Sequence, residues 1–203
     1  MTFLTPAWDH ALLVLLNQQW RTGFFDLIAP VLSATWLIWV LGGVGLVLGV
    51  RAVGFRRMLP ALCVILAVGA ADGMTAVLKK EICRQRPLNT VPGTWLHESG
   101  GWSQRPADYE PKGGCGSSFA SAHASNTMAV ALSIVLLWPR RATFCLLLLP
   151  LLTGWSRVYL GKHYPTDVLA GWIIGLVAAL AVWGLWRLLE GYWRRFIPPG
   201  GRA

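Results

Sequence analysis

The chain has 203 residues, of which 55% are hydrophobic and only 13% are charged, with 12 tryptophans and a formal net charge of +9. So apolar a composition excludes an ordinary soluble domain and argues against a nucleic-acid partner, in spite of the positive charge. We therefore expect an all-α integral membrane protein whose residues 1–203 form a single domain. Its predicted architecture is a bundle of about five transmembrane helices with an N-terminal interfacial helix.

Residues 1–26 are the first predicted element. Their apolar run, Ala11 to Leu16, is too short to cross a bilayer. The segment also lacks the basic start and the small-residue cleavage site of a signal peptide. We expect a helix that lies in the membrane interface.

Five apolar segments follow as predicted transmembrane helices. A helix needs about 20 apolar residues to cross a hydrocarbon core of roughly 30 Å. The first and last segments reach this length without a charged residue, whereas the other three carry polar residues near one end. In chain order the segments are Leu27 to Val50, Leu59 to Val77, Phe119 to Trp138, Ala142 to Leu160 and Val168 to Trp186.

Arginine clusters follow the first, third and fifth predicted helices, so all of them fall on one side of the membrane. Cytoplasmic loops are enriched in Lys and Arg, which makes this side cytoplasmic and the bacterial inner membrane the expected location. The N-terminus, a long loop over 82–118 and the stretch from Ser156 to Asp167 then face the periplasm or the outside. The clustered residues are Arg51, Arg56, Arg57, Arg140, Arg141, Arg194 and Arg195.

Further cations lie on the outer side, where this topology does not explain them. Any one of them could be a side chain that snorkels to the interface. Polar groups that converge at one end of a membrane bundle are costly, however, and indicate a functional site with an anionic partner. The outer cations are Lys79, Lys80, Arg84, Arg86, Arg157 and Lys162.

Three polar clusters lie at the outer ends of three different predicted helices. Lys79 and Arg86 are seven residues apart and would share a helix face, and Pro87 ends that helix. A glycine- and serine-rich run before His123 would leave backbone N–H groups at a helix start for an anion. The third cluster is the stretch from Ser156 to Asp167.

The residue types in these clusters suit phosphoryl transfer. Asp167 follows His163 by four residues, so it would hold one ring nitrogen and leave the other as a nucleophile. His123 would protonate the departing alkoxide. A tetrahedral oxyanion would be neutralised by Lys79, Arg86 and Arg157. Together these roles predict a reaction through a phosphohistidine.

The order and spacing of these residues resemble the signature of the type 2 phosphatidate phosphatase superfamily, which includes membrane lipid phosphatases and vanadium haloperoxidases. The matching residues are Lys79-x6-Arg86-Pro87, Ser121-Ala122-His123 and Ser156-Arg157-x5-His163-x3-Asp167. The resemblance implies a metal-independent lipid phosphatase that needs no cofactor, and it adds Ser121 to the phosphate-binding residues. The family usually has glycine where this chain has Ala122, so we expect strain there if the site needs a glycine-only backbone angle.

The chain is also similar in length and span count to the small bacterial undecaprenyl diphosphate phosphatases. We therefore expect hydrolysis of undecaprenyl diphosphate to undecaprenyl phosphate at the outer membrane interface. The motifs contact the phosphate and not the tail, so phosphatidylglycerophosphate, phosphatidate and lipid A 1-phosphate are alternatives, as is phosphotransfer to another lipid. A lipid-phosphate transporter would leave the histidines without a purpose, and a purely structural bundle partner would leave the whole polar cluster unexplained.

Other polar residues lie outside the motifs. Cys83 and Cys115 bracket the outer loop and face an oxidising compartment, which predicts a disulfide. Asp72, inside the second predicted helix, either belongs to a polar network below the site or is a structural hydrogen-bonding residue. The long outer loop is expected to be a lid or mobile. We expect His97 and Glu98 within it to be solvated and not to bind a metal.

Overall fold

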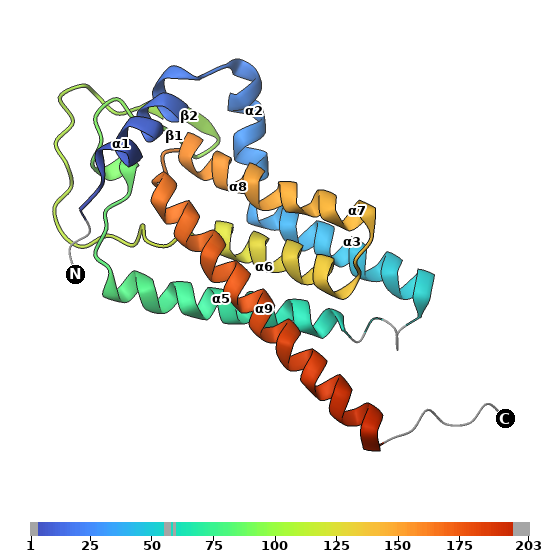
Figure 1. Cartoon of the computed structure of the whole chain (residues 1–203). Helices are drawn as coiled ribbons and strands as arrows, with labels where there is room; N and C mark the ends of the chain where they lie inside the picture. The colour runs from blue at the N-terminus through green and yellow to red at the C-terminus, as the bar shows by residue number, and fades with distance from the viewer. Residues whose placement is uncertain (1–3, 55–57, 59, 197–203) are drawn as a thin grey trace.

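A computed structural model describes residues 4–54, 58 and 60–196 of the chain. It is predominantly helical, which confirms the predicted all-α class, and its only described strands form one short hairpin of β1 (Trp95–Glu98) and β2 (Gly101–Gln104). Short 3₁₀ or π turns cover Leu15–Gln19, Pro87–Asn89 and Cys145–Leu147. The α-helices in Figure 1 are α1 (Ala7–Val14), α2 (Gly23–Leu32), α3 (Thr35–Val53), α5 (Ala61–Glu81), α6 (Ala122–Leu137), α7 (Arg141–Phe144), α8 (Leu148–Tyr159) and α9 (Pro165–Phe196).

Among the described residues, three helical stretches are long and apolar enough to cross a membrane. They are Ala61–Glu81, Arg141–Tyr159 and Pro165–Tyr192, and they coincide with the second, fourth and fifth predicted segments. The third predicted segment is the shorter apolar helix α6. The end of α3 and the start of α7, which carry clustered arginines, lie at the opposite end of the bundle from the start of α9 (Figure 1). Two other residues of these clusters, Arg56 and Arg57, lie outside the described residues.

The first predicted transmembrane segment is not one continuous helix, and the prediction is wrong on this point. Helix α2 ends at Leu32, Ala34 is extended with ψ 118°, and α3 begins at Thr35. Helix α2 stands at a steep angle to α3 in Figure 1. Phe25 of α2 packs edge-on against Trp155 of α8, with ring centroids 5.1 Å apart. Tertiary packing thus breaks a run that is uniformly apolar in the sequence.

Helices α6 and α9 approach each other closely through two glycines of α9. A Cβ added at Gly171 would lie 2.5 Å from the carbonyl oxygen of Ser121, and one added at Gly175 would meet the carbonyl oxygen of Ser125. Small residues allow transmembrane helix backbones to touch in this way. The contact fixes the start of α6 beside the start of α9, where the backbone N–H of Ser121 donates to the backbone oxygen of Asp167 at 2.9 Å.

The N-terminal segment packs against the end of the bundle with one face. Leu13 is fully buried in a cluster that includes Tyr164. Asn17, also fully buried, donates to the carbonyl oxygen of Trp95 at 2.8 Å and accepts from its N–H at 2.9 Å. The opposite face exposes apolar side chains such as Trp8. Its placement in the membrane interface stays a prediction, but the inner face is part of the protein core.

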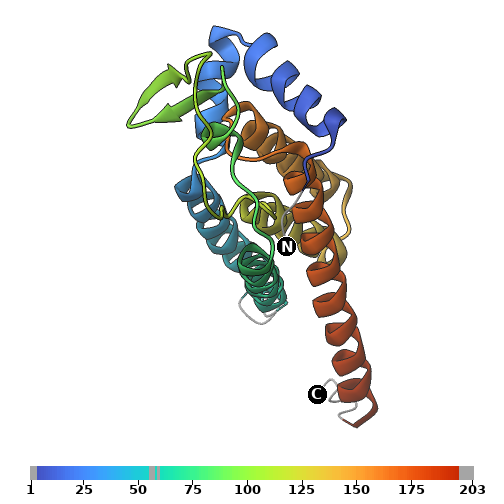
Figure 2. The same ribbon diagram turned by 90° about the vertical axis from the view of Figure 1, so that its left-hand side faces the viewer.

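The outer segment contains a β-hairpin that the sequence did not predict. Trp95 pairs with Gln104 and Glu98 with Gly101 in an antiparallel register, and the hairpin stands out from the helices in Figure 2. His97 is half-buried and packs edge-on against Trp102, with ring centroids 5.2 Å apart. The expectation of a fully solvated histidine is therefore wrong, while Glu98 is exposed as predicted.

An arginine attaches this hairpin to the N-terminal segment and to α8. The guanidinium of Arg21 lies over the rings of Trp95 and Trp102, at 4.5 and 4.1 Å from their centroids. It also forms an ion pair with Asp26. The carboxylate of Asp26 accepts a hydrogen bond from the Tyr159 hydroxyl at 2.6 Å. Cation–π and ionic contacts therefore hold three separate segments together around one side chain.

Candidate active site

The polar clusters identified in the sequence lie at one end of the bundle. Helices α5 and α8 end there, and α6 and α9 begin there (Figure 1). Lys79 is in the last turn of α5, His123 in the first turn of α6, Arg157 in the last turn of α8 and Asp167 in the first turn of α9. Four helix ends therefore surround one region.

His163 lies in the turn between α8 and α9 and is only 2% exposed. Its Nδ1 atom is 3.6 Å from Oδ2 of Asp167, which is longer than a hydrogen bond but close enough for the carboxylate to act on the ring. The turn depends on Gly161, which has φ +64° and whose added Cβ would lie 2.5 Å from the side chain of Thr94. A larger residue at 161 would displace the turn that carries the histidine.

The carboxylate of Asp167 is fully buried and has several donors. Its Oδ2 atom accepts hydrogen bonds from the Ser118 hydroxyl at 2.6 Å and from the Tyr164 backbone N–H at 2.9 Å. Its Oδ1 atom forms an ion pair with Arg84. Because both oxygens are engaged, the plane of the carboxylate is fixed next to His163.

Arg84 and Ser118 are contacts of the site that the sequence motifs missed. Arg84 was recognised only as one outer cation among six, and Ser118 only as part of a glycine- and serine-rich run. Their backbones are also paired, because the N–H of Ser118 donates to the carbonyl oxygen of Arg84 at 2.9 Å. The only signal in the sequence was the presence of both residues beside the motifs, which does not indicate that they share Asp167.

Arg157 is 5% exposed and is held from two sides. Its guanidinium donates to the hydroxyl of Ser33, in the break between α2 and α3. Its carbonyl oxygen accepts the backbone N–H groups of Lys162 and His163 at 3.1 and 3.3 Å. Ser33, at the break in the first predicted span, thus provides a hydrogen-bond acceptor for Arg157. No sequence pattern had indicated this contact.

Electrostatic interactions join the predicted site residues to one another. His123 interacts with Arg157, His163, Lys162 and Lys79. His163 in turn interacts with Arg157 and Arg86. Cations that lie close together and are partly buried repel one another, which raises the free energy of the folded chain unless a bound anion offsets the repulsion. The arrangement therefore fits an anion-binding site, and it includes Lys162, to which the motifs assign no role.

Burial and the neighbouring cations keep the imidazole of His163 neutral. Desolvation, together with the nearby charges of Arg157 and Arg86, lowers the pKa of His163 to about 4, although Asp167 acts to raise it. Burial and the same two arginines also lower the pKa of Lys162. A neutral imidazole has a free electron pair at neutral pH, as a nucleophile requires.

The middle motif adopts an ordinary helix start. Ser121 is the N-cap of α6, and its fully buried hydroxyl oxygen accepts the N–H of Ala124 at 3.5 Å. Ala122 is the first helical residue, and Ser99 is the only described non-glycine residue with a positive φ. Alanine in place of the family glycine therefore requires no left-handed backbone, and the expected strain at 122 is absent.

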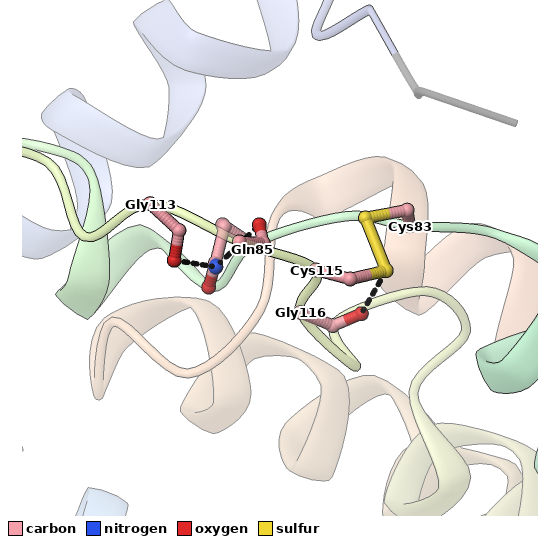
Figure 3. Close-up of a disulfide and its surroundings, with 6 residues drawn as sticks. Cys83, Gln85, Gly113, Cys115 and Gly116 are labelled. Carbon is pink, nitrogen blue, oxygen red and sulfur yellow. Dashed lines mark hydrogen bonds between the residues drawn. A yellow bond between two sulfur atoms is a disulfide. The ribbon is translucent and has the colours of Figure 1, made fainter.

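A disulfide lies beside the residues that hold Asp167. Cys83 and Cys115 are joined, with their Cα atoms 5.0 Å apart and a sequence separation of 32 (Figure 3). The side chain of Gln85 donates to the backbone oxygens of Gly114 at 2.9 Å and of Gly113 at 3.3 Å. The disulfide thus joins the segment that contains Arg84 to the segment that leads into α6.

Asp72 lies on α5, on the inner side of this region. Its side chain is exposed on the helix surface, and its Oδ1 atom accepts a hydrogen bond from Asn126 of α6 at 3.2 Å. It also interacts electrostatically with Lys79. The hydrogen bond with Asn126 matches the structural interpretation of Asp72, and the interaction with Lys79 matches its membership of a polar network.

Among the described residues, no group of three His, Cys, Asp or Glu side chains could hold a metal ion.

Comparison with known proteins agrees with the resemblance in the motifs. The profile of the PAP2 superfamily matches residues 60–189. This range is more than half of the chain, so the chain belongs to the PAP2 superfamily.

Curated relatives match over shorter stretches. The undecaprenyl-diphosphatase of Sulfolobus acidocaldarius is 33% identical over 49% of this chain and 42% of its own length. The undecaprenyl-diphosphatase BcrC of Bacillus subtilis is 41% identical over 30% of this chain and 31% of its own length. The lipid A 4'-phosphatase of Bacteroides thetaiotaomicron is 38% identical over 30% and 28%, respectively. The chain thus spans less than half the length of the curated relatives it matches.

Two solved structures share the fold over most of the chain. LpxE of Aquifex aeolicus has a TM-score of 0.63 at 21% identity and covers 90% of this chain and 98% of its own. The first transmembrane PAP2 type phosphatidylglycerolphosphate phosphatase from Bacillus subtilis has a TM-score of 0.61 at 24% identity, with coverages of 88% and 84%. The chain is therefore a membrane-type helical bundle of the PAP2 fold.

Proposed function

We propose that the chain is a metal-independent lipid phosphatase that acts through a phosphohistidine on His163. The observation that carries this proposal is the buried, neutral His163, placed between the fixed carboxylate of Asp167 and a group of cations. A transporter of lipid phosphates would need the cations but not this histidine. Membership of the PAP2 superfamily supports the same reaction class.

In the first step, Nε2 of His163 attacks phosphorus and the bond to the leaving oxygen breaks. His123 gives its proton to that oxygen, because the negative charge of a bound phosphate favours the protonated imidazole. Asp167 offsets the positive charge that develops on His163. The equatorial oxygens would be held by Lys79, Arg86, Arg157 and the backbone N–H groups that follow Ser121 in the first turn of α6.

In the second step, a water molecule attacks the phosphohistidine. His123, now neutral, takes a proton from the water, and the bond between phosphorus and Nε2 breaks. Phosphate leaves, and His163 regains its electron pair. Each bond that forms is matched by one that breaks, and no external acid or metal takes part.

We propose undecaprenyl diphosphate as the substrate, hydrolysed at the outer face of the bacterial inner membrane. Two of the matching relatives described above are named for this activity. The clustered arginines lie at the end of the bundle opposite the site, and because such clusters favour the cytoplasmic side, they support a site that faces outward. Lipid A phosphates and phosphatidylglycerophosphate are the second candidates, because a relative and a structural neighbour carry those names. Transfer of the phosphoryl group to another lipid is a further alternative.

A substrate panel tests this proposal. Phosphate release from undecaprenyl diphosphate, phosphatidylglycerophosphate, phosphatidate and lipid A is compared in detergent, with a chelator present. We expect the highest kcat/KM for undecaprenyl diphosphate, and His163→Ala should lower turnover by at least about 10³-fold while lipid binding persists. The matched control is His97→Ala, outside the site. Robust turnover by the His163 variant, or no turnover of any substrate by the unsubstituted chain, would refute the proposal.

A further inference from the structure

Arg84 forms a two-sided bridge inside the outer end of the bundle. It is 3% exposed, and its guanidinium lies 4.1 Å from the ring centroid of Tyr164. One nitrogen, NH1, donates to Oδ1 of Asp167 and to the hydroxyl of Thr166 at 2.6 Å. The other, NH2, donates to Oδ2 of Asp9 in α1. Arg84 therefore connects the N-terminal helix to the carboxylate beside His163.

Asp9 is bound to the start of α9 in a second way. Its carboxylate is fully buried. Oδ1 accepts the backbone N–H of Thr166 at 2.8 Å, and Oδ2 accepts the Thr166 hydroxyl at 2.7 Å. A carboxylate that accepts an N–H in the first turn of a helix also interacts favourably with the helix dipole. Asp9 thus caps the helix that carries Asp167, from a position 157 residues earlier in the chain.

The charges of this bridge explain why a second acid is needed. Asp9, Arg84 and Asp167 together carry a net charge of −1 when all three are ionised. Without Asp9, the buried guanidinium would neutralise Asp167, and little net negative charge would remain beside the imidazole. His163 acquires positive charge when it attacks phosphorus, so its environment must stay negative.

We infer that Asp9 is a positioning residue for the nucleophile: through Arg84 and Thr166 it fixes the Asp167 carboxylate and preserves its negative charge. The inference rests on the proposed function, since it assigns Asp9 a task in the reaction of His163. It makes α1 a support of the active site, in addition to its predicted place in the membrane interface.

Substitution in the full-length protein tests the inference. Asp9→Asn should lower kcat by about 10- to 100-fold, the range seen when a group that orients a metal-bound imidazole is removed. KM should change by less than about threefold, because other groups hold the phosphate. The matched control is Asp26→Asn, which removes an acid from the same N-terminal segment but one that pairs with Arg21 and Tyr159. We expect it to lower the melting temperature and to leave kcat within about threefold.

A double variant separates charge balance from folding. Asp9→Asn with Arg84→Met removes both members of the Asp9–Arg84 ion pair, which is tolerated better than the loss of one. It also removes the ion pair of Arg84 with Asp167, whose Oδ2 atom keeps its hydrogen bonds from Ser118 and the Tyr164 N–H. Because Asp167 then keeps its own charge, the double variant should have a higher kcat than Asp9→Asn alone. If Asp9→Asn does not fold, the double variant decides: a kcat within about tenfold of the unsubstituted chain supports the inference and a larger loss overturns it.

An independent readout does not need turnover. Nitrogen NMR of the labelled protein reports which ring nitrogen of His163 carries the proton, and the other three histidines are assigned by substitution. We expect the Nδ1–H form in the unsubstituted chain and a mixture of both forms in Asp9→Asn. Unchanged kcat and ring protonation in Asp9→Asn, or equal losses of kcat in Asp9→Asn and Asp26→Asn, would overturn the inference. Failure of the proposed function is distinct, because the unsubstituted chain would then hydrolyse no lipid phosphate.

Discussion

The two ends of the helical bundle are stabilised in different ways. At the end that holds the candidate site, charged and polar side chains such as Asp9, Arg84 and Asp167 are almost fully buried and bonded to one another. Towards the opposite end, α9 extends away from the other helices (Figure 2) and exposes apolar side chains such as Leu185 and Leu188. Buried polar groups need partners, whereas apolar groups in a membrane need only lipid. The buried and mutually bonded polar side chains are therefore concentrated where the chemistry is proposed.

The largest expected effect comes from opening the outer end at its disulfide. Replacing Cys83 and Cys115 by serine should lower the free energy of unfolding by about 3 to 4 kcal/mol for a loop of this length. It should also lower kcat, because Arg84 and Ser118 lie next to the bridge. Thermal unfolding and turnover measure both effects, and Cys145→Ser, at an exposed free cysteine, is the control. Two free thiols at 83 and 115 in protein isolated without reductant would contradict the bridge.

Separating α6 from α9 should have the next largest effect. Gly171→Ala places a methyl group against the backbone of Ser121 and should destabilise the protein by about 1 to 3 kcal/mol. Turnover should also fall, because the two helix starts carry His123 and Asp167. Gly184→Ala is the matched control on the same helix, since its added Cβ meets nothing within 4 Å. Equal melting temperatures for the two variants would show that the close approach does not matter.

The lowered pKa of His163 predicts a particular dependence on pH. Because the imidazole has a pKa of about 4 in the folded chain and 6.5 in the unfolded chain, the unfolded state binds more protons between these values. The contribution of His163 to stability is therefore present above pH 6.5 and is lost as the pH falls towards 4. The acid limb of kcat/KM should lie near pH 4, after correction for titration of the substrate phosphate. A limb at pH 6.5 would show an ordinary, solvated histidine.

The smallest effect is expected below the site. Asp72→Asn keeps an oxygen that can accept the hydrogen bond from Asn126, and the side chain is exposed. Turnover should therefore change by less than about threefold and the melting temperature by less than about 2 °C. Asp72→Leu, which removes the acceptor, provides the contrast. A loss of more than tenfold in Asp72→Asn would mean that the charge itself acts on Lys79.

The sequence predicted the parts of the site that depend on local spacing. His163 and Asp167 are four residues apart across the start of α9, so their neighbourhood follows from local spacing. The predicted helix shared by Lys79 and Arg86 is wrong, because α5 ends at Glu81 and Arg86 is extended. Arg84 bonds to Asp9 across 75 residues, and Arg157 bonds to Ser33 across 124. Such pairs arise from tertiary packing, which a single sequence does not encode in any local pattern.

The fold, like the site, was predicted where it depends on a local sequence pattern and not where it depends on tertiary contacts. Apolar length identified the helical stretches Ala61–Glu81, Arg141–Tyr159 and Pro165–Tyr192. It failed at Ser33, where a hydrogen bond to Arg157 accompanies a break that hydropathy does not reveal. It also failed for the hairpin at Trp95 to Gln104, which is fixed by contacts with Asn17 and Arg21 from the N-terminal segment.

The bond between Asp9 and Thr166 also constrains biosynthesis. Residues separated by 157 positions leave a ribosome roughly 10 to 30 s apart at 5 to 20 residues per second. The hydrogen bonds of Asp9 can therefore form only after the start of α9 has been made. The N-terminal helix and the start of α9 thus join only late in the synthesis of the chain.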